Sequence, residues 1–208
     1  GLEPGTVAMD DRTRELLSRE VLTDLVEHAD DTDRSALAML SLRLGPDGVK
    51  GWLMACAKAS ELWADPGGWR SPMRAQVLQL LGLPSDFDEA ALAQECADDA
   101  FDCASLRACL ATLQDWNTKS GRDAAEPVSA WLAADAAQRL ATLACFNGSL
   151  LVADGSKPKN LTNLAKRDPL YEGNVEAVRA NLDAIREKHA LLALTEYLAP
   201  ALELGRRF

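Results

Sequence analysis

The residues that could do chemistry gather in one short stretch, which holds the densest group of cations in the sequence. Four cations within eleven residues, and two polar side chains between them, form the candidate site: Lys157, Lys159, Asn160, Thr162, Lys166 and Arg167. Such side chains bind phosphate oxygens of nucleic acids, so the pattern indicates contact with two or three backbone phosphates. No aromatic residue is interleaved, so base stacking is not predicted. Taken alone, the pattern is more typical of an exposed loop whose lysines only keep the protein soluble.

A second group consists of three carboxylates, Asp98, Asp99 and Asp102. Spacings of three and four residues bring side chains together on a helix, so an acid–base pair or a metal site is conceivable. A solvated acidic face or a cluster at a helix N-terminus fits the same spacing better.

The five cysteines and two histidines do not form a metal-binding pattern. No two cysteines have the CxxC spacing, the number of cysteines is odd, and both histidines lie far from them in sequence. A zinc site needs tighter ligand spacing. We therefore expect five reduced thiols that pack as small apolar side chains in a cytoplasmic protein.

The common catalytic motifs are absent from the sequence. It contains no GxxxxGK[ST] or GxGxxG phosphate cradle, no GxSxG nucleophile elbow and no HExxH pair. We therefore expect no cofactor in this chain and disfavour a small stand-alone enzyme.

The composition predicts an all-α fold. The chain of 208 residues contains 35 Ala and 34 Leu but only 9 Val and 1 Ile. Alanine and leucine favour helices, whereas buried strands need β-branched residues. Lys and Arg number 22 against 32 Asp and Glu, a net charge of −10. That balance argues against strong binding of nucleic acid by the chain as a whole.

The periodicity of apolar residues predicts a series of helices. Asp10 or Asp11 caps the first, over about 12–29. Further helices are expected over 33–44, 47–64, 72–81 and 88–97, and another that ends at about 117. Ser71 and Pro72 start the helix at 72–81. A polar loop follows at 118–125, and Pro127 opens the next helix. The inward face of the first helix is expected to hold these side chains: Leu16, Leu17, Val21, Leu22, Leu25 and Val26.

The last third of the chain has a different pattern. A short apolar run and the turn residues Asp154 and Gly155 predict a small β-hairpin or an extended loop near 149–160. A short helix at 161–167 and a long final helix from about 169–175 follow. At ~1.5 Å per residue that final helix is about 45–50 Å long, which suits a connector to a larger body.

The two ends suggest a single domain, residues 1–208, excised from a longer chain. The sequence starts at Gly1 without an initiator Met and stops at Phe208 within an amphipathic pattern. No apolar run approaches the ~18 residues of a membrane span, so no membrane contact is expected.

Three stretches carry a resemblance to a known family. The first is Pro-Gly-Thr-Val-Ala-Met-Asp-Asp at 4–11, followed by Arg-Thr-Arg-Glu-Leu-Leu. The second is Leu-Leu-Val-Ala-Asp-Gly-Ser-Lys-Pro-Lys at 150–159, with 161–166 and Pro169 after it. The third covers 191–208. In this order they resemble subdomain 1B of UvrD-like DNA helicases, most of all the AddA-type subunit of the AddAB helicase–nuclease in its alphaproteobacterial form.

The resemblance implies a parent protein that is an ATP-dependent 3′–5′ DNA translocase in double-strand-break repair. ATP and Mg²⁺ would be bound by RecA-like domains outside these residues, so this part of the chain should not hydrolyse ATP. Its expected role is to hold duplex DNA near the fork through the six residues of the candidate site. The alternative is a protein–protein docking module that faces the nuclease partner subunit. Pull-down of that subunit by this chain in the absence of DNA distinguishes the two hypotheses.

Overall fold

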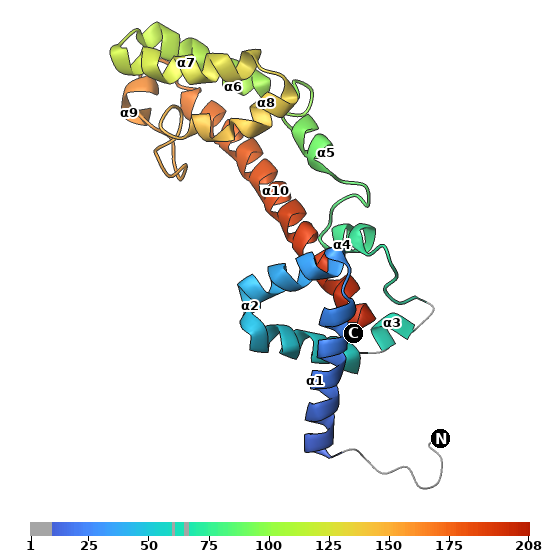
Figure 1. Ribbon diagram of the computed structural model, residues 1–208. Helices are drawn as coiled ribbons and strands as arrows, with labels where there is room; N and C mark the ends of the chain where they lie inside the picture. The colour runs from blue at the N-terminus through green and yellow to red at the C-terminus, as the bar shows by residue number, and fades with distance from the viewer. Residues whose placement is uncertain (1–9, 60, 65–66) are drawn as a thin grey trace. The chain divides into compact units, whose positions relative to one another are not determined.

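The computed structural model describes residues 10–59, 61–64 and 67–208, and within them every regular element is a helix (Figure 1). The predicted all-α fold is therefore confirmed. The helices are α1 Asp11–His28, α2 Asp31–Lys58, α3 Glu61–Ala64, α4 Arg74–Leu80, α5 Glu89–Gln94, α6 Cys103–Trp116, α7 Lys119–Ala133, α8 Ala136–Ala141, the 3₁₀ turn η1 Leu143–Phe146, α9 Leu161–Leu164 and α10 Tyr171–Arg207. The long C-terminal helix predicted from the sequence is α10.

The chain divides into two compact units. The first consists of Gly1–Asp86 together with Ala193–Phe208, and the second of Phe87–Leu192. Each unit has its own buried core, so each is described by itself. A single 1B-like subdomain over 1–208 stays a prediction.

The core of the first unit forms where α2 and the end of α10 pack together. Its buried side chains are Ala36, Leu40, Val49, Leu53, Ala201 and Leu204. Gly45 has φ +70°, which breaks the helical path of α2 just before Pro46. The break expected between the helices at 33–44 and 47–64 is thus a kink inside one helix, and glycine suits it because L-residues with a side chain avoid this backbone region.

The N-terminal helix α1 does not bury the face that its sequence pattern predicts. The exposed fractions are 57% for Leu16, 46% for Leu17, 37% for Val21 and 52% for Val26. Only Leu22 packs against the core of the unit, and the Leu25 side chain lies outside the described ones. The predicted inward face is wrong for these four residues because no described element of the unit covers them.

The start of α4 also differs from its prediction. The helix begins at Arg74, and Met73 rather than Ser71 is its N-cap residue, without a side-chain cap. The Met73 backbone N–H instead donates to Glu203 Oε1 at 2.8 Å, from α10 of the same unit. A contact with α10 therefore satisfies a backbone N–H at the start of α4, where we predicted a local cap by Ser71.

The second unit is built on α6, α7 and the first part of α10. The α10 residues Tyr171, Val175, Val178 and Leu182 are fully buried at helical spacing. An aromatic cluster completes the core: the ring centroid of Trp131 lies 4.7 Å from that of Phe101 and 5.2 Å from that of Phe146.

Residues 119–125 belong to helix α7, so the predicted polar loop at 118–125 is wrong. Asn117 ends α6 in the left-handed conformation, φ 41°, and Thr118 caps α7 at once by accepting the Gly121 N–H at 3.0 Å. Pro127 lies inside α7 rather than at its start. A proline there removes one backbone hydrogen bond, but the packing of buried Val128 and Trp131 keeps the helix continuous.

The hairpin expected near 149–160 forms only in part. Leu151 and Pro158 make an isolated antiparallel bridge, the Lys159 N–H donates to the Leu150 carbonyl at 2.8 Å, and the Val152 N–H donates to the Lys157 carbonyl at 2.9 Å. Gly155 turns the chain with φ +75°. No strand forms in this segment. The result is a turn over residues 150–159 that these contacts close, which we call the stapled turn, and it presents Lys157 at its surface.

Replacing Tyr171 with Phe should raise the free energy of unfolding by about 1 kcal/mol. The Tyr171 hydroxyl is buried and has no hydrogen-bond partner among the residues that the structure describes, and burial raises its pKa. Removing an unpaired buried polar group removes its desolvation penalty. Urea unfolding followed by circular dichroism measures the change. The control is Thr112→Val, whose hydroxyl lies 2.9 Å from Asp168 Oδ2 and whose loss should cost about 1–2 kcal/mol. A destabilised Tyr171→Phe variant contradicts the prediction.

Candidate nucleic-acid interface

The structure places all six residues of the candidate site in one segment that runs from the stapled turn through α9. Lys157, Thr162, Lys166 and Arg167 are exposed, and Lys159 and Asn160 are half-buried. Asn160 has φ 58° and precedes the first residue of α9. The segment therefore presents cations on both sides of α9.

Two of the four cations already have partners within the protein. Lys159 Nζ donates to the Gly148 carbonyl within the stapled turn. Arg167 Nη1 lies 3.2 Å from Asp115 Oδ2 and donates to the Asp115 carbonyl at 3.4 Å, at the end of α6. Within the described ranges, Lys157 and Lys166 form no ion pair with a carboxylate. The Gly148 carbonyl is a neutral acceptor, so Lys157, Lys159 and Lys166 all keep their positive charge, whereas Arg167 is paired with a carboxylate.

The segment is anchored on its inner side. Leu150, Leu151 and Leu164 are fully buried. After α9, Asp168 Oδ1 accepts the Leu170 N–H at 2.9 Å, and Asp168 Oδ2 lies 2.9 Å from Thr112 Oγ1 of α6. A buried inner side and an exposed cationic outer side reduce the ordering cost of binding an extended polyanion.

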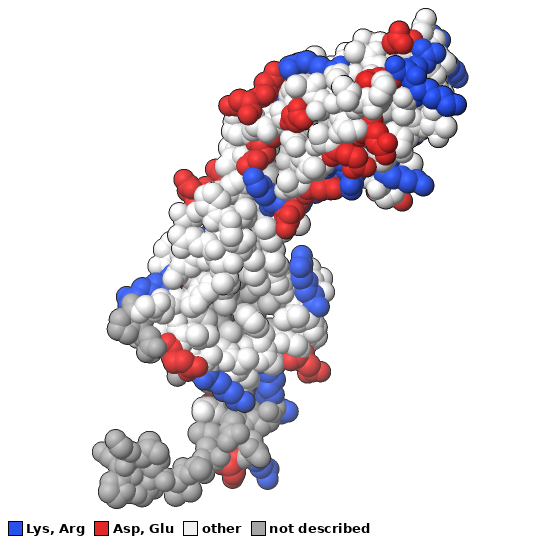
Figure 2. Space-filling view, turned by 180° about the vertical axis from the view of Figure 1, so that it is seen from behind, with Lys and Arg blue, Asp and Glu red and all other residues white. Residues whose placement is uncertain are grey.

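The electrostatic field around the segment is mixed. The second unit contains 11 Lys and Arg against 16 Asp and Glu, a net charge of −5. Figure 2 shows that cationic and acidic side chains alternate over its surface. Next to the site, hydrogen bonds from Ser156, and to a smaller extent the charge of Lys157, lower the pKa of Asp154. Any attraction for phosphate is therefore local, and salt at physiological strength reduces it.

The acidic group of the sequence separates into two structural roles. Asp102 caps α6 by accepting the Ser105 N–H at 3.0 Å. Asp98 accepts from Arg139 at 2.6 Å and from Arg107 at 2.9 Å, and these two hydrogen bonds lower its pKa. Among the residues that the structure describes, no group of three or more His, Cys, Asp or Glu is arranged to hold a metal ion.

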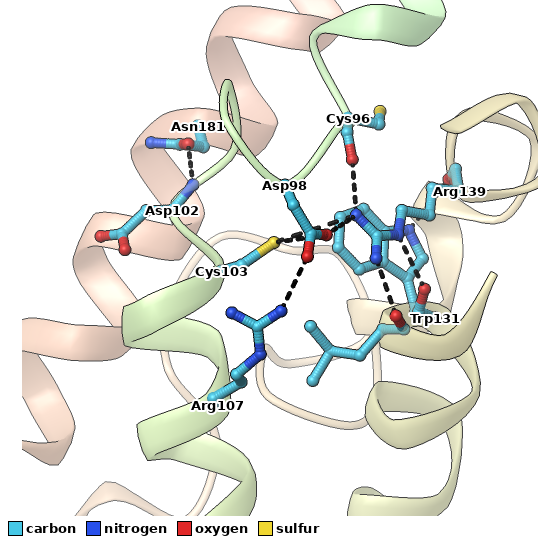
Figure 3. A network of polar contacts seen from close by, with 9 residues as sticks. Cys96, Asp98, Asp102, Cys103, Arg107, Trp131, Arg139 and Asn181 are labelled. Atoms are coloured by element: carbon cyan, nitrogen blue, oxygen red, sulfur yellow. Dashed lines mark hydrogen bonds and ion pairs between the residues drawn. The ribbon is translucent and has the colours of Figure 1, made fainter. Parts of the chain in front are cut away.

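Arg139 is the residue that sequence reasoning missed (Figure 3). Arg139 is 6% exposed, and its guanidinium lies 4.8 Å from the centre of the Trp131 ring. It donates to the carbonyls of Trp131 at 3.1 Å, Cys96 at 2.9 Å and Leu132 at 2.7 Å, in addition to Asp98. Protein acceptors take up four of its five N–H groups, so Arg139 ties three segments together rather than binding a ligand. One arginine in a helical pattern gives no sequence signal for this role.

The five cysteines are all free thiols, and four of them are buried. Burial raises the pKa of Cys96 to about 11, that of Cys109 to about 12 and that of Cys145 to about 11. Since the thiolate is the nucleophile, these side chains are protonated and unreactive at neutral pH.

Two further findings bear on the class of protein. In the described part of the chain, no helix has the length and apolar character needed to span a bilayer. No protein-family model, curated protein or solved structure matches the chain.

Proposed function

We propose that this chain is an accessory subdomain of a UvrD-like DNA helicase that contacts the backbone of duplex DNA near the fork. The observation that carries the proposal is the anchored segment with exposed cations at Lys157 and Lys166. Cations on a fixed backbone can contact phosphates at low entropic cost and without sequence preference. The resemblance of three stretches to the AddA-type subunit supplies the context of double-strand-break repair.

In this proposal the chain positions DNA and another part of the parent protein does the mechanical work. ATP and Mg²⁺ act in RecA-like domains of the parent, which drive translocation in the 3′–5′ direction. With a net charge of −5 in the unit that holds the site, its own affinity is weak. A non-specific dissociation constant of roughly 10⁻⁴ M or above is expected at physiological salt.

Fluorescence anisotropy of a labelled forked duplex at low salt tests the proposal. Replacing Lys157, Lys159, Lys166 and Arg167 together with Ala should weaken binding by about tenfold or more, because each phosphate contact contributes to affinity. The control variant removes four exposed cations of the first unit: Arg12, Arg34, Lys58 and Arg206. Equal affinities of the two variants would exclude the proposed contacts.

A second candidate function, docking to a nuclease partner subunit, is favoured by the exposed apolar side chains of α1. Next to them, Leu22 and Val26 of α1 and Leu37 and Val49 of α2 line a groove of about 390 Å³. Exposed apolar surface of this kind marks protein contact sites. Capture of the partner subunit without DNA, and its loss on Leu17→Asp, would favour docking over DNA positioning.

A further inference from the structure

We propose that the phosphate-binding surface is built from two elements distant in sequence, the first turn of α7 and the turn that follows α9. Its cations are Lys119, Arg122, Lys166 and Arg167, which we call the α7–α9 surface. Its ligand is the sugar–phosphate backbone of duplex DNA. The inference rests on the proposed function and extends it, because Lys119 and Arg122 lie outside the basic stretch of the sequence.

The ion pair of Arg167 brings the two elements together. Its guanidinium reaches the carboxylate and the carbonyl of Asp115, in the last turn of α6, at 3.2 and 3.4 Å. Because Asn117 and Thr118 alone separate α6 from α7, Lys119 and Arg122 follow within seven residues of that contact. A Cβ on Gly121 would lie 2.8 Å from the Leu113 carbonyl oxygen, so the two helix ends are held at close range.

The charges of α7 on this surface are available to a ligand. Lys119 and Arg122 are exposed, and their spacing of three residues puts them on one face of the first turn. Arg122 Nη1 donates to the side-chain and backbone oxygens of Asn117 at 3.0 and 3.2 Å. These acceptors are neutral, so they hold the guanidinium in place without cancelling its charge. The N-terminal end of α7 adds a partial positive charge.

Carboxylates lie among the cations of this surface. Asp115 is paired with Arg167, Asp168 follows Arg167 and accepts from Thr112 and the Leu170 N–H, and Asp123 and Glu126 follow Arg122 on α7. Among the described residues, Lys119, Arg122 and Lys166 form no ion pair with a carboxylate, so these three cations carry the inference in a unit whose overall charge is −5. Figure 2 shows Lys and Arg side chains gathered at the end of this unit where the α6–α7 turn and α9 lie, with acidic side chains beside them.

The stapled turn offers a second contact in this arrangement. Lys159 donates to the neutral Gly148 carbonyl, and the charge of Lys157 contributes to lowering the pKa of Asp154. Both lysines therefore keep their positive charge and can contact a phosphate beside the α7–α9 surface.

The test is anisotropy of a labelled forked duplex with the 208-residue chain between 20 and 200 mM salt, roughly the range in which counterion release dominates binding. Lys119→Ala with Arg122→Ala should weaken binding by about fivefold or more and lower the salt slope by about 1.8, since each phosphate contact contributes about 0.9. Lys119→Arg with Arg122→Lys should retain the slope. The matched control, Lys58→Ala with Arg206→Ala, removes two exposed cations of the first unit and should change neither quantity.

The outcomes separate this inference from the proposed function. In one outcome, the Lys119/Arg122 double Ala variant binds with wild-type affinity, and removal of the four cations of the 157–167 stretch weakens binding. That outcome overturns the α7–α9 surface and leaves the proposed function standing. If the wild-type chain gives no change in anisotropy with the duplex, both proposals fail. Circular dichroism of each variant shows that a loss of binding is not a loss of fold.

Discussion

Replacing Arg139 with Met is expected to lower the free energy of unfolding of the second unit by about 2–4 kcal/mol, because two backbone carbonyls lose their hydrogen-bond donor. Methionine fills much of the same volume but donates no hydrogen bond. The carbonyls of Cys96 and Leu132 lose the Arg139 donor, whereas the Trp131 carbonyl keeps the Ala134 N–H at 3.2 Å. The Asp98 side chain is 58% exposed and remains solvated. Unpaired buried carbonyls cost free energy because water cannot replace the lost donor. Urea unfolding, with hydrogen exchange of the α7 amides to localise the effect, measures the change.

The matched control is Arg107→Met. Arg107 pairs with the same carboxylate, Asp98, at 2.9 Å, but its side chain is 56% exposed. An exposed ion pair contributes at most about 1 kcal/mol, so this variant should remain close to wild type. If Arg139→Met lowers the free energy of unfolding no more than Arg107→Met does, then the burial of Arg139 and its contacts with backbone carbonyls do not stabilise the second unit.

Replacing Gly205 with Ala is expected to destabilise the first unit by about 1–3 kcal/mol, the usual cost of overpacking a core. A Cβ added at Gly205 would lie 2.5 Å from Cys56 Sγ and 3.0 Å from Cys56 Cβ. Either α2 or α10 must then shift at the place where they form the core. Thermal unfolding followed by circular dichroism gives the change in midpoint.

Two further variants isolate the close contact in the first unit. Gly51 lies inside α2, and a Cβ there meets nothing within 4 Å. Gly51→Ala should therefore stabilise the chain by about 0.5–1 kcal/mol through helix propensity. Cys56→Ala removes the sulfur, so Gly205→Ala should cost less in that background. A stabilising Gly205→Ala in the wild-type background would show that the helices are not in close contact.

Local physics was enough to locate most helix starts. Asp10, Asp88 and Asp102 each lie just before a helix and accept a backbone N–H three residues ahead. These bonds involve neighbouring residues only, so residue type and spacing predict them. The long α10 was predictable for the same reason, because its apolar residues keep helical spacing over many turns.

The predictions that were wrong concern segments whose structure depends on tertiary contacts, which the spacing of residues in the sequence does not reveal. Residues 119–125 of the polar segment are helical because buried residues of α7 hold them against α6. Four apolar residues of α1 are exposed because no described element of the unit covers them. In both places the periodicity is the same as that of a correctly assigned helix, and only the packing partner differs.

Composition and local spacing were enough to determine the helical class, several aspartate caps and the 157–167 stretch of cations, because these depend on residue types and on residues close in the chain. The tertiary structure decided which charges are available. It paired Arg167 with Asp115, tied Lys159 to the Gly148 carbonyl and buried Arg139 among carbonyls. It also brought Lys119 and Arg122 to the same end of the unit as Arg167. Charge compensation depends on distance in space, and residues up to 52 positions apart meet at this surface.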